Sequence, residues 1–187
     1  PALRPTGSRN AVIPASALWV DLLNPTLDEI HQVEGVFGIV VPTREEMQEI
    51  EASSRVYQED GGLFMTTSVV SKTESKNPES GAVTFVIARE KLLTIRYTEP
   101  MPFNTFPARA ERQHGLWASA DILMAGLLES IIDRTADILE RVGAEVDGVS
   151  RTTFDPSRHG AALAGSELQG ILVRLGKQND LSSKVRE

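Results

Sequence analysis

The spacing of apolar residues divides the chain into a first half of short elements and a second half of long helices. Leu18 to Leu22 is typical of a short strand. Thr26 follows a turn sequence and predicts the start of a helix, which Gly38 is placed to end. The apolar face of this helix consists of Leu27, Ile30, Val33 and Phe37. Thr43, followed three residues later by Glu46, has the form of a capping box and predicts a second short helix.

The middle of the first half is rich in Val, Ile, Thr and Phe, which are residues that favour strands. The four predicted strands are residues 54–58, 63–71, 82–88 and 92–97. Short polar turns join the first to the second and the third to the fourth, so the pattern predicts two hairpins. A polar loop, Lys72 to Ser80, separates them, and residues 103–113 are predicted to form a helix.

From Ser119 onward the pattern changes to that of a long helix. Seven residues recur at alternating spacings of four and three: Leu128, Ile132, Thr135, Leu139, Val142, Val146 and Val149. This heptad pattern predicts a helix roughly 45 Å long with one apolar seam. Residues 150–165 contain Pro and Gly and are interpreted as a connection. A second, antiparallel helix is predicted over 166–187, and its seam is continued by Leu168, Ile171, Leu175 and Val185.

These elements together predict an α+β protein. We expect an α/β/α layered head with a mixed, largely antiparallel sheet, followed by a long antiparallel helical hairpin. The expected division is a flexible segment over 1–16, the head over 17–115 and the hairpin over 116–187. No Gly, Asn or Pro follows the last apolar residue, so nothing in the sequence ends the second helix. The chain is therefore interpreted as a piece of a longer protein.

Composition excludes several classes of protein. The chain has 187 residues, of which 41% are hydrophobic and 24% charged, a balance typical of globular proteins. It contains no cysteine, which excludes disulfide scaffolds, cysteine-ligated metal sites and thiol catalysis. The longest apolar run, Ile122 to Leu128, is far shorter than the ~20 residues of a membrane span. No phosphate-binding loop, nucleophile elbow or paired histidine motif is present, so the sequence does not indicate an enzyme.

The charge is acidic and unevenly distributed. The chain has 19 basic and 26 acidic residues, and no basic cluster is present, so a nucleic-acid partner is not expected. Seven acids and two bases fall between Ser119 and Val149. Glu129, Asp133 and Asp137 are spaced four apart, where like charges on a helix repel by a few tenths of a kcal/mol per pair. Water and salt, a basic neighbour or a bound cation would offset this repulsion.

Several stretches share the order and spacing of a known family. They are Trp19–Leu22, Pro42–Glu51 with Arg55–Met65, Val83–Ile87 with Leu92–Tyr97, Ser119–Leu123 with Leu127–Leu139, and Leu175–Lys177 with Ser182–Glu187. Together they resemble the cytosolic part of the CorA family of magnesium and divalent-cation transporters. The Gly-Met-Asn signature of that family follows its first transmembrane helix, and this sequence does not contain it.

The resemblance implies a cytosolic regulatory domain at the cytoplasmic face of the inner membrane. It implies a homopentamer that transports Mg²⁺ through C-terminal membrane helices lying outside this sequence. It also implies that carboxylates between neighbouring subunits sense cytosolic Mg²⁺, and that their occupancy favours the closed pore. A hard cation takes oxygen ligands and retains several waters, so one or two carboxylates per site suffice. The candidate ligands are Glu74 in the polar loop and Asp133 and Asp137 on the long helix.

Two other interpretations stay open. A ZntB-like zinc transporter shares the architecture, which leaves Zn²⁺ or Co²⁺ as alternatives to Mg²⁺. An α/β interaction domain unrelated to transport is the other. Two apolar stretches of about 20 residues encoded after Glu187, with Gly-Met-Asn between them, would separate the transporters from the interaction domain.

Overall fold

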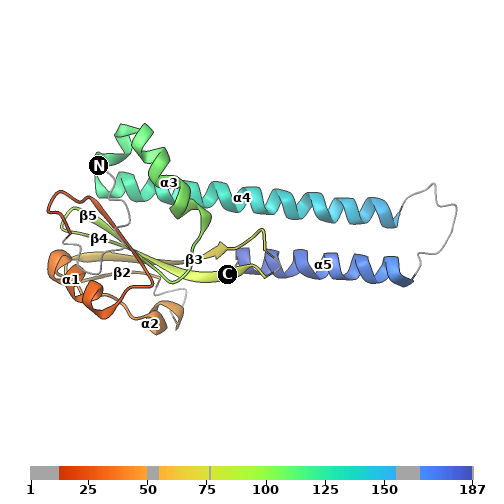
Figure 1. Cartoon of the computed structure of the whole chain (residues 1–187), viewed down its shortest axis with the longest axis horizontal. Coiled ribbons are helices and arrows are strands. Elements are labelled where there is room, and N and C mark those ends of the chain that lie inside the picture. The colour runs from red at the N-terminus through yellow and green to blue at the C-terminus, as the bar shows by residue number, and fades with distance from the viewer. Residues whose placement is uncertain (1–12, 50–54, 76, 155–164, 187) are drawn as a thin grey trace.

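A mixed sheet flanked by helices forms one end of the molecule, and a helical hairpin projects from it (Figure 1). The structure is a computed structural model that describes residues 13–49, 55–75, 77–154 and 165–186. The segment predicted to be flexible, 1–16, and the connection predicted over 150–165 lie largely outside the described residues.

The sheet has five strands in the order β1-β5-β4-β3-β2. Their bounds are β1 (Trp19–Leu23), β2 (Val56–Glu59), β3 (Gly62–Ser71), β4 (Glu79–Ala88) and β5 (Lys91–Arg96). The edge strand β1 runs parallel to β5, and the three other pairings are antiparallel. The predicted fold class, with its mixed and largely antiparallel sheet, is therefore confirmed.

Both predicted hairpins are present and close through two-residue turns. Asp60 and Gly61 join β2 to β3, and Arg89 and Glu90 join β4 to β5, all four with positive φ. Turns of this kind match the twist of the flanking strands, although they favour Gly or Asn. Arg89 and Glu90 are neither, and Arg89 Nη1 donates a 3.0 Å hydrogen bond to the Val36 carbonyl. This side-chain bond anchors an otherwise costly backbone conformation.

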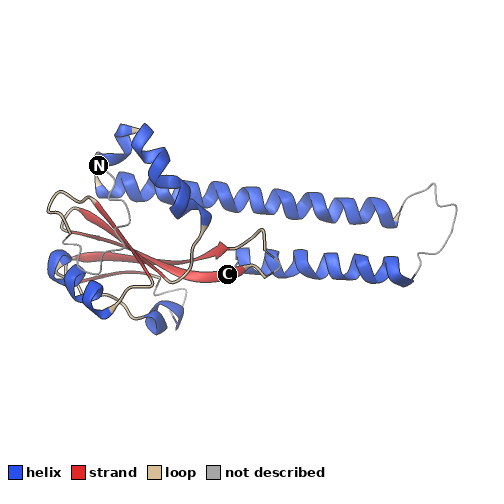
Figure 2. Ribbon diagram, in the orientation of Figure 1, coloured by secondary structure: helices blue, strands red, loops and turns tan. Residues whose placement is uncertain are grey.

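Helices cover both faces of the sheet, which makes the head a three-layer structure (Figure 2). The helices of the head are α1 (Leu27–Phe37), α2 (Arg44–Glu49) and α3 (Met101–Arg112), with the 3-10 turn η2 (His114–Trp117). Capping boxes start α1 and α2; the one at Thr43 was predicted as such, whereas at Thr26 only the start of a helix was predicted. Thr26 exchanges hydrogen bonds with Glu29, and Thr43 does the same with Glu46.

Each face of the sheet has its own apolar core. On one face, α1 and α2 pack over a cluster that includes Phe37, Phe64 and Leu93. On the other, α3 and a longer helix pack over a cluster that includes Phe85 and Phe106. Central strand residues such as Leu93 are completely buried because helices shield the sheet from both sides.

The hairpin consists of α4 (Ala120–Thr153) and α5 (Gly165–Arg186), which lie side by side and run in opposite directions (Figure 1). The first turns of α4 belong to the head, because Leu123, Leu127 and Ile131 pack into the core over the second face of the sheet. Beyond Ile131, α4 leaves the sheet. The return helix α5 ends beside β3 and β4, where the hairpin meets the sheet.

The predicted seam of α4 is wrong in part. Ile132, Leu139 and Val146 are 66%, 45% and 40% exposed. Val149, the last residue of the predicted row, is buried, and so is Ile138, which lies outside that row. Two apolar rows adjoin each other in this sequence, and the heptad count selected the wrong one. The head fixes the rotation of α4 through Leu123 and Leu127, and that rotation carries the neighbouring row to the inside.

Candidate functional site

A cluster of charged side chains joins the β3–β4 loop to α4. Glu74, in this loop, reaches α4 because β3 and β4 extend well past the head. One oxygen of Glu74 accepts hydrogen bonds from Arg134, at 2.8 Å, and from Arg141. Thr73 adds two contacts: its hydroxyl accepts from Arg134 and its carbonyl from Arg141. The loop is thereby fastened to α4 at two positions that are about two turns apart.

The two arginines also set the ionisation of Glu74. Hydrogen bonds from Arg141 and then Arg134 lower the pKa of the Glu74 carboxyl below its ordinary value of 4.5. The carboxylate is thus firmly ionised at neutral pH while its charge is already compensated. A divalent cation at Glu74 would have two guanidinium groups beside it, whose positive charges oppose its binding.

Asp133 lies one turn before Asp137 on α4 and is close to α3. Its carboxylate is 4.0 Å from Arg109 Nη1, and the same guanidinium bonds Glu129 and Ser130. The side chain of Asp133 is largely exposed. A cation at Asp133 would therefore have a basic neighbour that is shared with Glu129.

Of the three predicted ligands, Asp137 has the fewest contacts with described residues. It is exposed and makes no hydrogen bond or ion pair with any described residue. Arg134 precedes it by three residues and Arg141 follows it by four, so Asp137 lies on the side of α4 that faces the β3–β4 loop. By helical spacing Asp137 is thus a neighbour of both arginines that bind Glu74, whereas Asp133 has Arg109 of α3 beside it.

One chain does not assemble a complete metal site in the part that the structure describes. Among those residues, no group of three or more His, Asp or Glu side chains could hold an ion. What each chain offers is single carboxylates on an exposed helix surface. Such groups complete a cation site only when another surface supplies the remaining ligands.

Sequence reasoning missed a partly buried polar network at the β1 edge of the sheet. Arg96 Nε and Nη2 grip the Asp21 carboxylate at 3.1 and 2.8 Å, and Arg96 Nη1 donates to the Thr98 carbonyl. Thr94 donates to Asp21 at 2.7 Å and accepts from the indole of Trp19 at 3.0 Å. Asp21 in the middle of an apolar strand was the available signal, because a charge at such a position requires a partner.

This network has a structural role. The guanidinium of Arg96 also lies over the ring of Phe103, 4.7 Å from its centroid. The nitrogen atoms of this guanidinium therefore bond Asp21 of the parallel strand β1, and its flat face packs on Phe103 of α3. The network holds an edge strand and a helix to the sheet, and it leaves no ligand positions open.

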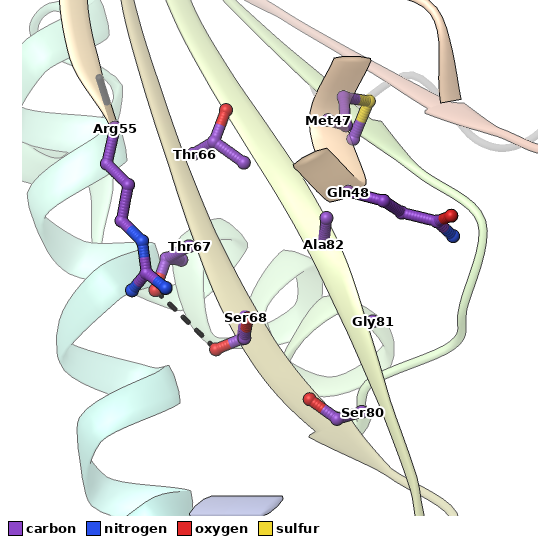
Figure 3. A pocket seen from close by; sticks show the side chains of 9 residues that line it. All are labelled: Met47, Gln48, Arg55, Thr66, Thr67, Ser68, Ser80, Gly81 and Ala82. Atoms are coloured by element: carbon purple, nitrogen blue, oxygen red, sulfur yellow. Dashed lines mark hydrogen bonds between the residues drawn. The ribbon is translucent and has the colours of Figure 1, made fainter. Parts of the chain in front are cut away.

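A shallow cavity of about 240 Å³ lies between α2 and the far ends of β3 and β4 (Figure 3). Arg55 extends alongside Thr67 and Ser68, and Gln48 comes from α2. No carboxylate lines this cavity, so it does not suit a divalent cation. It also holds no pairing of a nucleophile with a base, so it does not indicate catalysis.

Comparison with known proteins identifies the class and then the family. The fold resembles two solved structures from Methanocaldococcus jannaschii. The soluble domain of CorA aligns with a TM-score of 0.55 and 11% identity, over 90% of this chain and 81% of that one. The complete CorA magnesium transporter aligns with a TM-score of 0.60 and 12% identity, over 100% of this chain and 68% of that one. At this low identity the likenesses define the class of fold, an α+β domain with a long helical hairpin. The model of the CorA-like Mg²⁺ transporter protein family matches residues 14–182, and the chain belongs to this family.

Curated relatives extend well beyond the region of similarity. The magnesium transport protein CorA of Yersinia pestis is 30% identical over 172 residues, which are 92% of this chain and 52% of that protein. The protein of the same name from Escherichia coli K12 is 29% identical over 171 residues, 91% of this chain and 52% of its own length. The chain thus spans about half the length of these relatives.

The described helices were also compared with the requirements of a membrane span. None of them is both long enough and apolar enough to cross a bilayer.

Proposed function

We propose that this chain is the regulatory domain of a CorA-type Mg²⁺ transporter. The observation that carries the proposal is the family match over residues 14–182, almost the whole chain. The relatives that share this region are magnesium transport proteins. The proposal includes a homopentamer at the cytoplasmic face of the membrane, with the ion pathway in a part of the protein outside this sequence.

In this proposal the domain senses Mg²⁺ between subunits. Since one chain provides no cluster of three ligands among its described residues, the sensing site combines carboxylates of two neighbours. Mg²⁺ keeps several of its waters, so one carboxylate from each side is sufficient. When Mg²⁺ dissociates, the carboxylates of the two surfaces repel one another and the population shifts towards separated subunits. That separation opens the pore.

Asp137 is the residue we assign to this site, ahead of Glu74 and Asp133. It is exposed and has no partner among the described residues, so its charge is available to a cation. Glu74 supports the site indirectly, since it holds Arg134 and Arg141 and thereby lowers the positive charge that Asp137 experiences. Asp133 has Arg109 beside it.

The test uses the transporter that contains this chain, reconstituted in liposomes, with the Mg²⁺ concentration on the domain side varied. We expect influx of Mg²⁺ to fall as that concentration rises. In an Asp137→Asn variant influx should stay high, because the neutral side chain binds the cation poorly. Asp147→Asn is the matched control, because it removes one exposed charge from the same helix and should behave as the parent.

Three outcomes would count against the proposal. An Asp137→Asn variant that closes at the same concentration as the parent would remove Asp137 from the sensing site. Influx that is insensitive to Mg²⁺ on the domain side would remove the regulatory role altogether. Influx of Zn²⁺ in preference to Mg²⁺ would favour the zinc transporter instead.

A further inference from the structure

The cavity between α2 and the far ends of β3 and β4 has a lining of one charge and several hydroxyls (Figure 3). Among the described residues that line it, Arg55 is the one charged side chain. Four others carry hydroxyls: Thr66, Thr67, Ser68 and Ser80. A guanidinium with hydroxyl donors around it, and with no carboxylate among the described lining residues, suits an oxyanion rather than a metal ion.

The backbone of Arg55 is fixed so that its side chain borders the cavity. Its carbonyl accepts a 2.8 Å hydrogen bond from the Thr66 amide, which holds it against β3 just before β2 begins. From there the side chain extends along β3 to the level of Thr67 and Ser68 (Figure 3). A guanidinium has five N–H donors, so it serves several acceptors at once. Its planar fork bonds two oxygens of one phosphate group.

The four hydroxyls differ in how far they are engaged within the chain. Thr66 is buried and shares a 2.8 Å hydrogen bond with the hydroxyl of Thr84. Thr67 Oγ1 has a long contact of 3.5 Å with the carbonyl of Ser68. The hydroxyls of Ser68 and Ser80 make no hydrogen bond with any residue in the part of the chain that the structure describes. These two donors are therefore available to a ligand.

Strand alternation brings the two serines to one face of the sheet. Ser80 pairs with Val70, which is two residues beyond Ser68 on β3. Residues two apart on a strand, and those paired with them, project from the same face. This face is the one that α2 covers, because Phe64, four residues before Ser68, packs in the same core as Met47 of α2. Both hydroxyls are thus on the side of the sheet where the cavity lies.

This arrangement favours a phosphate group over a carboxylate. A carboxylate has two oxygens in one plane, which a single guanidinium satisfies. A phosphate monoester has three terminal oxygens that point in different directions, so hydroxyl donors beside the arginine are needed as well.

The cavity has room for more than the phosphate group. Its volume of about 240 Å³ is several times the ~30 Å³ of one water molecule. Met47 and Ala82 add apolar surface to the lining, and Gln48 adds an amide that both donates and accepts hydrogen bonds. These groups suit the carbon skeleton and the hydroxyls of a small sugar phosphate.

The acids next to the lining residues in sequence have other partners. Glu46, which precedes Met47, accepts hydrogen bonds from the amide and the hydroxyl of Thr43. Glu79, which precedes Ser80, pairs with Lys72 at 2.7 Å. The net charge of −7 opposes an anion only weakly from a distance, because salt screens exposed charges beyond about 8–10 Å.

We propose that this cavity binds a small phosphate ester, with Arg55 and the hydroxyls of Ser68 and Ser80 holding its phosphate group. The proposal does not depend on Mg²⁺ sensing, because none of the candidate cation ligands lines the cavity. It gives the domain a second input. The strands β3 and β4 continue from the cavity into the loop that carries Glu74, so a ligand that bridges them restrains this loop.

The test is isothermal titration calorimetry of the 187-residue chain with ribose 5-phosphate, in a buffer that contains neither phosphate nor Mg²⁺. We expect one ester per chain to bind with a Kd below about 1 mM, and ribose without phosphate to bind at least about tenfold more weakly. Arg55→Gln should weaken binding of the ester by about tenfold or more, because it removes a charged donor. The matched control is Arg112→Gln, an exposed arginine of α3 on the other side of the sheet, which should bind as the parent does.

A second variant keeps the proposal testable if Arg55→Gln does not fold. Ser68→Ala with Ser80→Ala removes two hydroxyls that have no partner among the described residues, so it should leave the fold intact and weaken binding several-fold. Unchanged affinity in this double variant would overturn the proposal.

Three other results would overturn it as well. They are no binding of the ester at concentrations up to about 10 mM, equal affinity in the parent and in Arg55→Gln, and equal affinity for inorganic phosphate, which would leave only a general anion site. None of these measurements involves Mg²⁺, so failure here is distinct from failure of the sensing proposal.

Discussion

The head and the hairpin are stabilised in different ways, although α4 is part of both. In the head, strand residues such as Val83, Leu92 and Leu93 are fully buried because helices cover both faces of the sheet. In the hairpin, each helix has a single helical neighbour. Beyond Ile131 the buried apolar residues of the described part are Ile138, Val149, Ile171 and Leu181. The head thus has apolar cores on both faces of its sheet, whereas the hairpin buries only a few apolar residues.

The charged groups of the two parts differ in the same way. The head holds the pair of Asp21 with Arg96, in which the arginine is buried and the polar atoms are satisfied by several hydrogen bonds. The pairs of the hairpin, such as Arg174 with Glu145, are exposed. Exposed pairs contribute about 0–1 kcal/mol each and are weakened by salt. The contrast teaches that charges position the hairpin, while apolar burial stabilises the head.

The largest effect is expected in the head. Replacement of Leu93 by Ala removes a fully buried side chain between two strands and should lower the free energy of unfolding by about 2–5 kcal/mol. Urea denaturation followed by circular dichroism measures this change. A loss below about 1 kcal/mol would contradict the description of the head as the stable part.

A smaller effect is expected in the hairpin, and it distinguishes two neighbouring residues. Ile138→Ala should destabilise α4 against α5 by about 2 kcal/mol, because Ile138 is buried between them. Leu139→Ala should change stability by less than about 0.5 kcal/mol, because Leu139 faces solvent. Amide hydrogen exchange of α5 measures the difference. If Leu139→Ala instead destabilises the hairpin more than Ile138→Ala does, the seam lies where the heptad pattern predicted it.

The smallest effect is expected where the two parts meet. Glu74→Gln should weaken the attachment of the β3–β4 loop to Arg134 and Arg141 by less than about 1 kcal/mol, because the pair is exposed. Faster hydrogen exchange in this loop would show it. Glu79→Gln is the matched control, because it breaks the exposed Lys72–Glu79 pair without contacting α4.

The same attachment should depend on pH in a defined direction. The pKa of Glu74 is lowered below 4.5 in the folded chain, so the attachment is complete above that value. It is lost as the pH falls through the lowered pKa, because the protonated carboxyl no longer attracts both arginines. Exchange in the loop of the parent should therefore approach that of Glu74→Gln in acid. A loop that loosens as the pH rises from 5 to 8 would contradict this assignment.

Local features of the fold were predictable from the sequence because they depend on few residues. The capping boxes at Thr26 and Thr43 and the two hairpins involve neighbours within a few positions. The rotation of α4 was not predictable, because Ile138 and Leu139 both belong to apolar rows and only contacts with the head select between them.

Long-range polar contacts of the candidate site were beyond the sequence pattern as well. Glu74 was singled out as a ligand, but its pairing with Arg134 and Arg141 joins residues 60 and 67 positions apart. The bond between Arg96 and Asp21 spans 75 positions. Assignment of Asp137 to cation sensing stays a prediction that rests on charge and exposure.

The separate cores on the two faces of the sheet have a consequence for synthesis of the chain. In chain order, the last residue of the core beneath α1 and α2 is Tyr97, whereas the core beneath α3 also includes Ile131. At roughly 5–20 residues per second, a nascent chain spends about 2–7 s with the first core available and the second unfinished. During that interval Phe85 and Leu92 lack their cover. We therefore expect this face of the emerging sheet to stay exposed to solvent until the start of α4 has left the ribosome.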